Sequence, residues 1–349
     1  MKIDGRPIAQ DPTRTFVIAE LSANHAGSVE NALAIVRAAA ESGADAIKLQ
    51  TYRPDTITIE HGGPLFRVGS GTVWDGRTLF DLYAEAHTPW EWHAALRDEA
   101  LRCGMTWFSS PFDESAVDFL ESLDAPAYKI ASFEIVDVGL IRRAAATGKP
   151  LIISTGMATY DEIAEALDTA RGAGATDVAL LKCTSAYPAP PEEVNLRTIP
   201  AMAEAFQVPV GLSDHTLGVA VPVAAVGAGA AIIEKHVTLR RADGGPDGLF
   251  SLEPRELAEM IAQVRVAERA LGSVNYNPTE SEVESRSLRR SLFVVEEVRA
   301  GEAFTSSSVR SIRPGHGLHT RHLPEVIGRR AARDVARGTP VSWDLFVPD

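Results

Sequence analysis

Between residues 16 and 271, short apolar runs alternate with longer alanine-rich stretches, and this alternation constrains the fold more than any other feature of the chain. The apolar runs predict eight β-strands, at residues 16–23, 44–50, 105–109, 127–130, 151–154, 178–183, 208–213 and 230–236. The stretches between them predict helices at residues 29–42, 114–122, 137–147, 160–172, 194–206, 217–227 and 254–271. Eight such units in about 270 residues indicate an α/β protein with a (β/α)8 TIM barrel. A doubly wound open sheet is the alternative, but residues 20–27 do not form the glycine-rich first turn of a dinucleotide site.

Composition narrows the class of protein. The chain has 349 residues, of which 45% are hydrophobic, so it can bury a large core. Its net charge of −13 argues against a general nucleic-acid or anionic-membrane binder, although a few local cations can still hold an anionic substrate. Only two cysteines occur, the N-terminus is polar, and no apolar run reaches membrane-spanning length. We therefore expect a cytoplasmic protein.

The pattern changes after residue 271 and predicts a second domain. We expect a catalytic barrel at residues 1–272, a polar linker at 273–287 and a compact, mostly β domain at 288–349 with strands at 290–295, 309–313 and 341–346. A long insertion at residues 52–96, rich in aromatic residues, follows the second barrel strand. Long loops at this edge of a barrel often form substrate pockets, although composition alone fits a packed surface loop equally well.

Two histidines end neighbouring strands of the predicted barrel. His215 lies in Gly211-Leu-Ser-Asp-His-Thr216, and His236 ends Ile232-Ile-Glu-Lys-His236. Parallel strands joined by one helix lie about 5 Å apart, so both side chains leave the same sheet edge and can share one metal ion. Because side chains alternate along a strand, Ser213 shares a face with His215 and Glu234 with His236. The alternative is that each histidine only caps its own strand.

Polar residues also end several other strands that begin apolar, at the barrel edge where active sites form. Lysine and serine donors suit phosphate and carboxylate oxygens. Glu20 and Glu234 are the carboxylates best placed for proton transfer. The predicted anion-binding set consists of Lys48, Ser110, Lys129, Ser132, Ser154 and Ser213.

Ordered motifs along almost the whole chain resemble those of the sialic acid synthase family. They are Ile18-Ala-Glu-Leu-Ser-Ala-Asn-His25, Ile47-Lys-Leu-Gln-Thr51, Ser109-Ser-Pro-Phe112, Tyr128-Lys-Ile-Ala-Ser132, Ile153-Ser-Thr-Gly-Met157, Lys182-Cys-Thr-Ser-Ala-Tyr-Pro188 and the two histidine motifs. The C-terminal domain, with Ser311-Ile-Arg-Pro-Gly315, resembles the antifreeze-like (SAF) domain of these enzymes. Within the family the chain is most similar to the branch that makes pseudaminic acid, on Thr72-Val-Trp-Asp-Gly-Arg77, Thr88-Pro-Trp-Glu-Trp-His93 and Phe133-Glu-Ile-Val-Asp137.

The resemblance implies a carbon–carbon bond-forming transferase. It would condense phosphoenolpyruvate with an acetamido sugar, in the pseudaminic branch the open-chain aldehyde of 2,4-diacetamido-2,4,6-trideoxy-altropyranose, and release phosphate. Manganese or magnesium, held by His215 and His236, would polarise the aldehyde. Glu20 would deprotonate the attacking water, and Glu234 would position or protonate the sugar oxygen. The family's dimers place the small domain over the partner's barrel, so Arg313 would act in trans.

The binding residues that the resemblance implies form two sets. Phosphoenolpyruvate would be held by Lys48, Ser110, Lys129, Ser132, Ser154, Ser185 and Ser213, and the sugar by Asn24, Tyr187, Asp247 and Arg313. Three alternatives stay open. The product is N-acetylneuraminate or legionaminate; or the barrel is an aldolase with Lys129 as Schiff-base lysine; or the chain is a non-catalytic carbohydrate- or ice-binding protein.

Overall fold

The computed structural model describes residues 1–10, 14–69 and 75–348. Thr72, Val73 and Trp74, part of one branch-specific motif, therefore lie outside the described residues. The chain divides into two compact units, Met1–Gly272 and Ser273–Asp349, each with its own hydrophobic core. Within the described residues, no helix is both long enough and apolar enough to cross a membrane.

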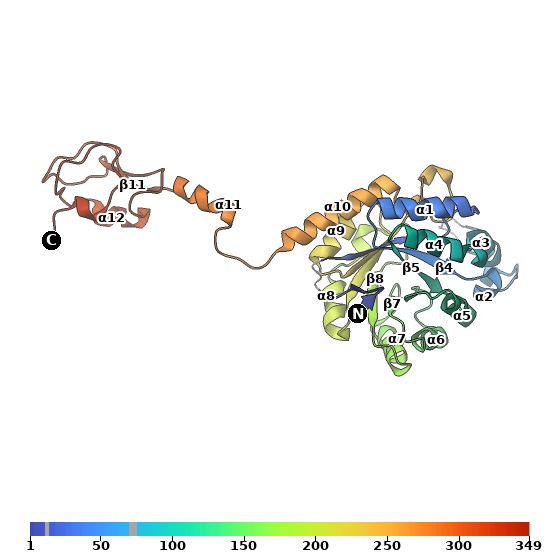
Figure 1. Ribbon diagram of the computed structural model, residues 1–349. Helices are drawn as coiled ribbons and strands as arrows, with labels where there is room; N and C mark the ends of the chain where they lie inside the picture. The colour runs from blue at the N-terminus through green and yellow to red at the C-terminus, as the bar shows by residue number, and fades with distance from the viewer. Residues whose placement is uncertain (11–13, 70–74, 349) are drawn as a thin grey trace. The chain divides into compact units, whose positions relative to one another are not determined.

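The first unit is a closed parallel barrel, so the barrel prediction is confirmed and the open sheet is excluded (Figure 1). Its strand order is β10-β3-β4-β5-β6-β7-β8-β9. The strands are β3 (Phe16–Glu20), β4 (Ala46–Thr51), β5 (Thr106–Pro111), β6 (Tyr128–Ile130), β7 (Leu151–Ser154), β8 (Val178–Cys183), β9 (Val210–Asp214) and β10 (Ile232–His236). A short hairpin of β1 (Lys2–Ile3) and β2 (Arg6–Pro7) precedes them, and Ile3 and Ile8 belong to the barrel's interior cluster.

Helices surround the barrel strands (Figure 1). They are α1 (Val29–Glu41), α4 (His93–Arg102), α5 (Glu114–Ser122), α6 (Val138–Ala145), α7 (Tyr160–Gly172), α8 (Thr198–Phe206), α9 (Ala220–Gly227) and α10 (Pro254–Leu271). The starts of two of them follow directly from local sequence. The Ser28 hydroxyl accepts from the Asn31 amide at α1, and Thr159 and Glu162 form a capping box at α7.

Residues 52–92 contain structure that the sequence pattern did not predict. Helices α2 (Pro54–Ile57) and α3 (Leu79–Ala86) lie within the insertion, together with the 3-10 turns η1 (Pro64–Phe66) and η2 (Trp90–Trp92). Helix α4 begins at once afterwards, at His93, and supplies the helix expected after the second strand. The other turns of this unit are η3 (Pro191–Glu193), η4 (Arg241–Asp243) and η5 (Gly248–Phe250).

The barrel interior is apolar at the amino ends of the strands and polar at their carboxyl ends. The interior cluster includes Ile18, Ala46, Ala127, Ile152 and Ile232. Two residues further along the same strands come Glu20, Lys48, Lys129, Ser154 and Glu234, all buried. The period-two alternation of a strand places each of these side chains on the inward face. On β9, glycine is required at position 211, because a Cβ there would lie 2.3 Å from the carbonyl oxygen of Ile232.

The second unit contains less β-structure than predicted. Its described residues, 273–348, contain one antiparallel pair, β11 (Ser291–Val294) and β12 (Val309–Ile312), together with α12 (Leu323–Val326) and the turn η7 (Thr320–His322). The strand predicted at 341–346 is wrong: Trp343–Leu345 forms the turn η8, and the segment is joined to its neighbours by single backbone hydrogen bonds and the isolated bridge of Phe346 to Ala331. Its apolar residues Val341, Leu345 and Phe346 nevertheless enter the core. Residues 273–287 are exposed and include α11 (Glu280–Val283) and the start of η6 (Glu284–Leu288).

Candidate active site

A cavity of about 590 Å³ opens at the carboxyl ends of the barrel strands. It collects residues from β4, β5, β6, β8, β9 and β10 and from the loops that follow the strands. Eleven of the residues proposed from the sequence line it: Lys48, Ser110, Lys129, Ser132, Ser185, Tyr187, Ser213, His215, Glu234, His236 and Asp247. The tertiary structure thus brings together residues that lie 199 positions apart in the chain, from Lys48 to Asp247.

Two lysines and two glutamates form a buried charged cluster at the floor of this cavity. Lys48 is ion-paired with Glu20, and its Nζ also lies 3.6 Å from Oε1 of Glu234. Lys129 approaches the same Oε1 to 3.3 Å. The Ser213 hydroxyl donates to it at 3.1 Å, and Lys48 Nζ donates to the Ser110 hydroxyl at 3.3 Å. Removing these charges from water is costly, so each requires its partner.

The two glutamates of the cluster differ in acidity. Burial raises the pKa of Glu20 to about 7, and the charge of Glu234 adds to this effect while Lys48 opposes it. Burial also acts on Glu234, but the charges of Lys129 and Lys48 outweigh it and lower the pKa of this carboxyl group. A carboxyl group that titrates near neutrality beside one that stays ionised is the usual arrangement for dividing acid–base roles.

The two histidines meet at one side of the cavity, with ring centroids 5.3 Å apart. Nδ1 of His215 lies 3.0 Å from the carbonyl oxygen of Thr184. Because a carbonyl can only accept, Nδ1 carries a proton, and Nε2 is the nitrogen that can bind a metal when the ring is neutral. Burial opposes a charge on this ring, but the contacts with Cys183 and Thr184 outweigh it and raise the pKa of His215 above its usual value. Burial lowers the pKa of His236 well below its usual value, so this ring is neutral, and its buried Nδ1 makes no hydrogen bond to any described residue.

These features fit a divalent metal ion bound by the two imidazoles. Neutral imidazole nitrogens with free lone pairs are metal ligands, and the hydrogen bond to Thr184 orients the His215 ring as a supporting contact does at metal sites. Among the described residues, no group of three or more His, Cys, Asp or Glu side chains is arranged to hold a metal. Substrate or water would therefore complete the coordination.

Several residues that line the cavity or contact its lining had no role assigned to them from the sequence. Gln50 lies on the inward face of β4, and its Nε2 donates to Oε1 of Glu20 at 3.2 Å and to the Ser22 hydroxyl at 3.0 Å. Burial raises the pKa of Glu134, in the loop after β6, to about 7. The alternation along β4 places Gln50 on the same face as Lys48, whereas Ser22 and Glu134 lie in loops where no such periodicity applies.

The outer part of the cavity is largely apolar. Its wall includes Ile57 of α2, Leu79 and Leu82 of α3, and Val68 between these helices. Tyr52 and Phe112 pack edge to face beside them, with ring centroids 5.0 Å apart. The predicted insertion therefore forms one wall of the pocket, as the functional interpretation of this segment expected. The cavity joins a charged floor to an apolar rim.

Four proposed site residues do not line the cavity. Glu20 lies beneath it and reaches it through Lys48 and Gln50. Ser154 is completely buried on β7, and its hydroxyl has no hydrogen-bond partner among the described residues. Asn24 is directed elsewhere, because its Nδ2 donates to the carbonyl of Val237 and to the Ser251 hydroxyl, both at 2.8 Å. Arg313 belongs to the second unit, where it lines a separate cavity.

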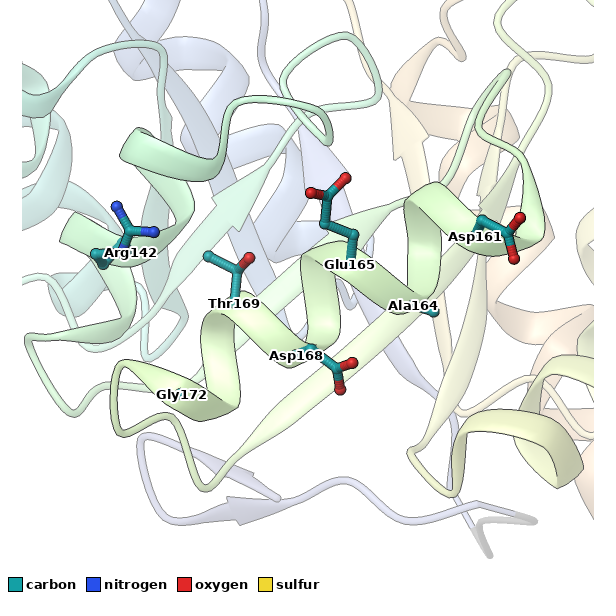
Figure 2. A pocket seen from close by; sticks show the side chains of 7 residues that line it. All are labelled: Arg142, Asp161, Ala164, Glu165, Asp168, Thr169 and Gly172. Atoms are coloured by element: carbon teal, nitrogen blue, oxygen red, sulfur yellow. The ribbon is translucent and has the colours of Figure 1, made fainter.

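A larger hollow of about 770 Å³ lies on the outside of the barrel, between α6 and α7. Figure 2 shows its side chains, with Asp161, Glu165 and Asp168 projecting from α7 and Arg142 from the facing helix. It lies on the helical layer and contains none of the strand-end residues. The cavity at the strand ends is therefore the candidate active site.

Known proteins with similar sequences and structures identify the family of this chain. The NeuB family profile matches residues 35–276, and the SAF domain profile matches residues 289–347. The chain is 43% identical to pseudaminic acid synthase of Campylobacter jejuni over 333 residues, which are 95% of this chain and 97% of that protein. It is 36% identical to N,N'-diacetyllegionaminic acid synthase of Legionella pneumophila over 351 residues, 98% of each protein.

The crystal structure of N-acetylneuraminic acid synthetase from Leptospira borgpetersenii in complex with citrate matches with a TM-score of 0.73 and 29% identity, over 82% of this chain and 94% of that one. The chain therefore belongs to the NeuB family of sialic acid synthases and carries a C-terminal SAF domain.

Proposed function

We propose that the chain is a pseudaminic acid synthase, which condenses phosphoenolpyruvate with 2,4-diacetamido-2,4,6-trideoxy-altropyranose. The observation that carries this proposal is its 43% identity to a pseudaminic acid synthase over almost the full length of both proteins. Identity to the legionaminic acid synthase is lower, at 36%.

The two halves of the cavity support the same substrate pair. The lysines and serines of the floor match the carboxylate and phosphate of phosphoenolpyruvate. The apolar wall from Ile57, Val68, Leu79 and Leu82 suits a sugar with a methyl group at carbon 6 and two acetyl methyl groups. A sugar with a hydroxyl at carbon 6 would leave that hydroxyl unpaired against this wall, which costs binding free energy.

The reaction that we propose forms one carbon–carbon bond and releases phosphate. Carbon 3 of phosphoenolpyruvate attacks the aldehyde carbon of the open-chain sugar, water adds at carbon 2, and the tetrahedral product loses phosphate to leave a 2-keto acid. A divalent cation held by His215 and His236 would supply Lewis acidity toward the aldehyde oxygen. Lys48 and Lys129 would bind the anionic groups of phosphoenolpyruvate, and Ser110 and Ser213 would orient them.

The acidities of the two glutamates support distinct roles. Glu20, with a pKa of about 7, is suited to accept the proton of the attacking water. Glu234 stays ionised between Lys48 and Lys129 and is suited to position the lysines and the sugar oxygen rather than to donate a proton. The Schiff-base alternative is disfavoured. A lysine must lose its proton to attack a carbonyl, and the ion pair of Lys129 with Glu234 favours the protonated ammonium form.

The action of Arg313 in trans, within a homodimer, is part of the proposal. Arg313 is exposed in the second unit, where Arg289, Arg290 and His319 line the same cavity. This cationic surface is suited to an acidic partner surface or substrate. Mixing an Arg313→Ala chain with a Lys129→Met chain tests the idea, since a dimer of the two would restore one intact site from two inactive parents. No recovery on mixing would contradict action in trans.

The test of the proposed function is direct product identification. The protein is incubated with phosphoenolpyruvate, Mn²⁺ and each of three sugars: the trideoxy altro sugar, the legionaminic precursor and N-acetylmannosamine. Mass spectrometry and NMR of the products should show pseudaminic acid as the main product, with phosphate released in equal amount. Preferential use of either other sugar would contradict the substrate assignment, and no turnover of any sugar would contradict the reaction.

A further inference from the structure

The loop after β3 contains a serine in a backbone conformation that serine rarely adopts. Ser22 has φ of +48°, in the left-handed region, and its side chain is 2% exposed at the cavity wall. A residue other than glycine in this region is held there against its own preference by its surroundings. Glycine would adopt the same backbone without strain, so the hydroxymethyl group requires another explanation.

The Ser22 hydroxyl connects two cavity residues from different parts of the barrel. It accepts a hydrogen bond from Nε2 of Gln50 at 3.0 Å and donates to Oδ2 of Asp247. Both bonding directions of the hydroxyl are therefore used. Gln50 gives its second amide proton to Glu20, so only its amide oxygen remains to accept a hydrogen bond from a ligand.

Asp247 accepts this hydrogen bond through its carboxylate, which also interacts with the backbone amide of Ala23. Its backbone is held separately, because the Ser251 hydroxyl donates to the Asp247 carbonyl at 2.6 Å and itself accepts from Asn24. Oδ2 of Asp247, the atom that Ser22 binds, also lies 3.8 Å from Nδ1 of His236. Loss of the Ser22 hydroxyl would thus remove the side-chain donor to Asp247, leave the Ala23 amide to orient the carboxylate, and leave the loop in place.

We propose that Ser22 is a positioning residue that holds Asp247 and Gln50 in the orientation that binds the sugar, at the expense of backbone strain. The inference rests on the proposed function for the identity of the ligand. It requires no direct contact between Ser22 and the sugar. On this proposal the Ser22 hydroxyl contributes to activity, and the strained backbone at Ser22 lowers the stability of the fold.

Three variants separate the hydroxyl from the strain. Ser22→Ala keeps the Cβ and loses the hydroxyl, Ser22→Gly loses both, and Ala26→Gly is a matched control. Ala26 has the same φ of +48° but is exposed and lies outside the cavity lining. We expect Ala26→Gly to raise Tm by about 2–4 °C without changing the kinetics. Ser22→Gly should melt above Ser22→Ala by a similar margin.

We expect the Ser22 variants to lose catalytic efficiency toward the sugar but not toward phosphoenolpyruvate. Both Ser22 variants should lower kcat/KM for the sugar by about tenfold or more, while KM for phosphoenolpyruvate stays within about twofold. In the Asp247→Asn background, Ser22→Ala should have little further effect, because the two residues act as a unit. Equal losses for both substrates, or independent losses in the double variant, would overturn the inference.

A crystal structure of Ser22→Ala provides a readout that does not depend on turnover. The side chains of Asp247 and Gln50 should each adopt a new rotamer or be spread over several rotamers. If both keep their wild-type positions, Ser22 does not position them and the inference fails, whichever sugar the enzyme uses. If the side chains move but the wild-type protein converts none of the three sugars, the failure lies with the proposed function instead.

Discussion

The ammonium group of Lys129 lies 3.3 Å from Oε1 of Glu234, directly across the barrel. The two residues lie on β6 and β10, which are separated by three strands on either side of the closed sheet. The layer beneath this ion pair is filled by apolar side chains such as those of Ile152 and Ile232. The charged layer thus rests on the apolar one.

The first prediction concerns this ion pair. Lys129→Met should destabilise the fold by about 3 kcal/mol, because one partner of a buried pair is left with less compensation. The double variant Lys129→Met, Glu234→Gln should lose less than the sum of the single variants. Urea unfolding measures both. Asp243→Asn is the control: it breaks the exposed pair with Arg240 and should cost less than about 1 kcal/mol. Strict additivity of the buried pair would contradict the coupling.

The second prediction concerns the two histidines. Treatment with EDTA should abolish product formation, and added Mn²⁺ or Mg²⁺ should restore it. His236→Ala should lower kcat about 100-fold or more and abolish the rise in Tm that Mn²⁺ causes in the wild-type protein. His61→Ala serves as the control, since His61 is exposed and does not line the cavity. Full activity of His236→Ala after chelation would rule out the metal site.

The third prediction concerns the pH dependence of stability. His93 is completely buried on α4, where its Nε2 lies 2.8 Å from the Thr51 hydroxyl and its ring packs against Phe119. Burial lowers its pKa from 6.5 to about 4. Protonation therefore favours the unfolded chain. The stability that the neutral ring provides is complete above about pH 6.5, and about 3 kcal/mol is lost as the pH falls to 4.

Substitution of His93 by glutamine tests this linkage. Between pH 6.5 and 4, the free energy of unfolding should fall less in His93→Gln than in the wild-type protein. The difference between the two decreases should be about 3 kcal/mol. His61→Gln should follow the wild-type curve. Chemical denaturation at a series of pH values gives the comparison, and parallel curves for His93→Gln and wild type would show that His93 does not titrate in this range.

The fourth prediction concerns substrate choice. Val68→Thr adds a hydroxyl to the apolar wall with almost no change in volume. It should lower kcat/KM for the trideoxy sugar by about tenfold and raise the relative use of N-acetylmannosamine, which carries a hydroxyl at carbon 6. Val266→Thr, on the exposed face of α10, is the matched control and should change neither value. If the ratio of kcat/KM for the two sugars is unchanged in Val68→Thr, this wall does not select the substrate.

The alternation of apolar runs and helical stretches was sufficient to predict the barrel, and alternation within each strand predicted most of the charged layer. Lys48, Lys129 and Glu234 could be placed in this way because a strand in a closed barrel has one inward face. The rule stops where the strand stops. β3 ends at Glu20, and the left-handed turn at Ser22 directs Asn24 away from the cavity.

Only the tertiary structure decided which loop residues contact one another at the cavity. The contacts of Ser22 with Gln50 and Asp247 connect residues up to 225 positions apart, and no local pattern encodes such distances. The apolar wall from α2 and α3 depends on how the insertion folds back over the barrel mouth. In the second unit, residues 341–346 have a strand-like composition, but Trp343–Leu345 forms a turn, and Val341, Leu345 and Phe346 pack into the core. Period-two alternation thus determined the floor of the site, and long-range packing determined its walls.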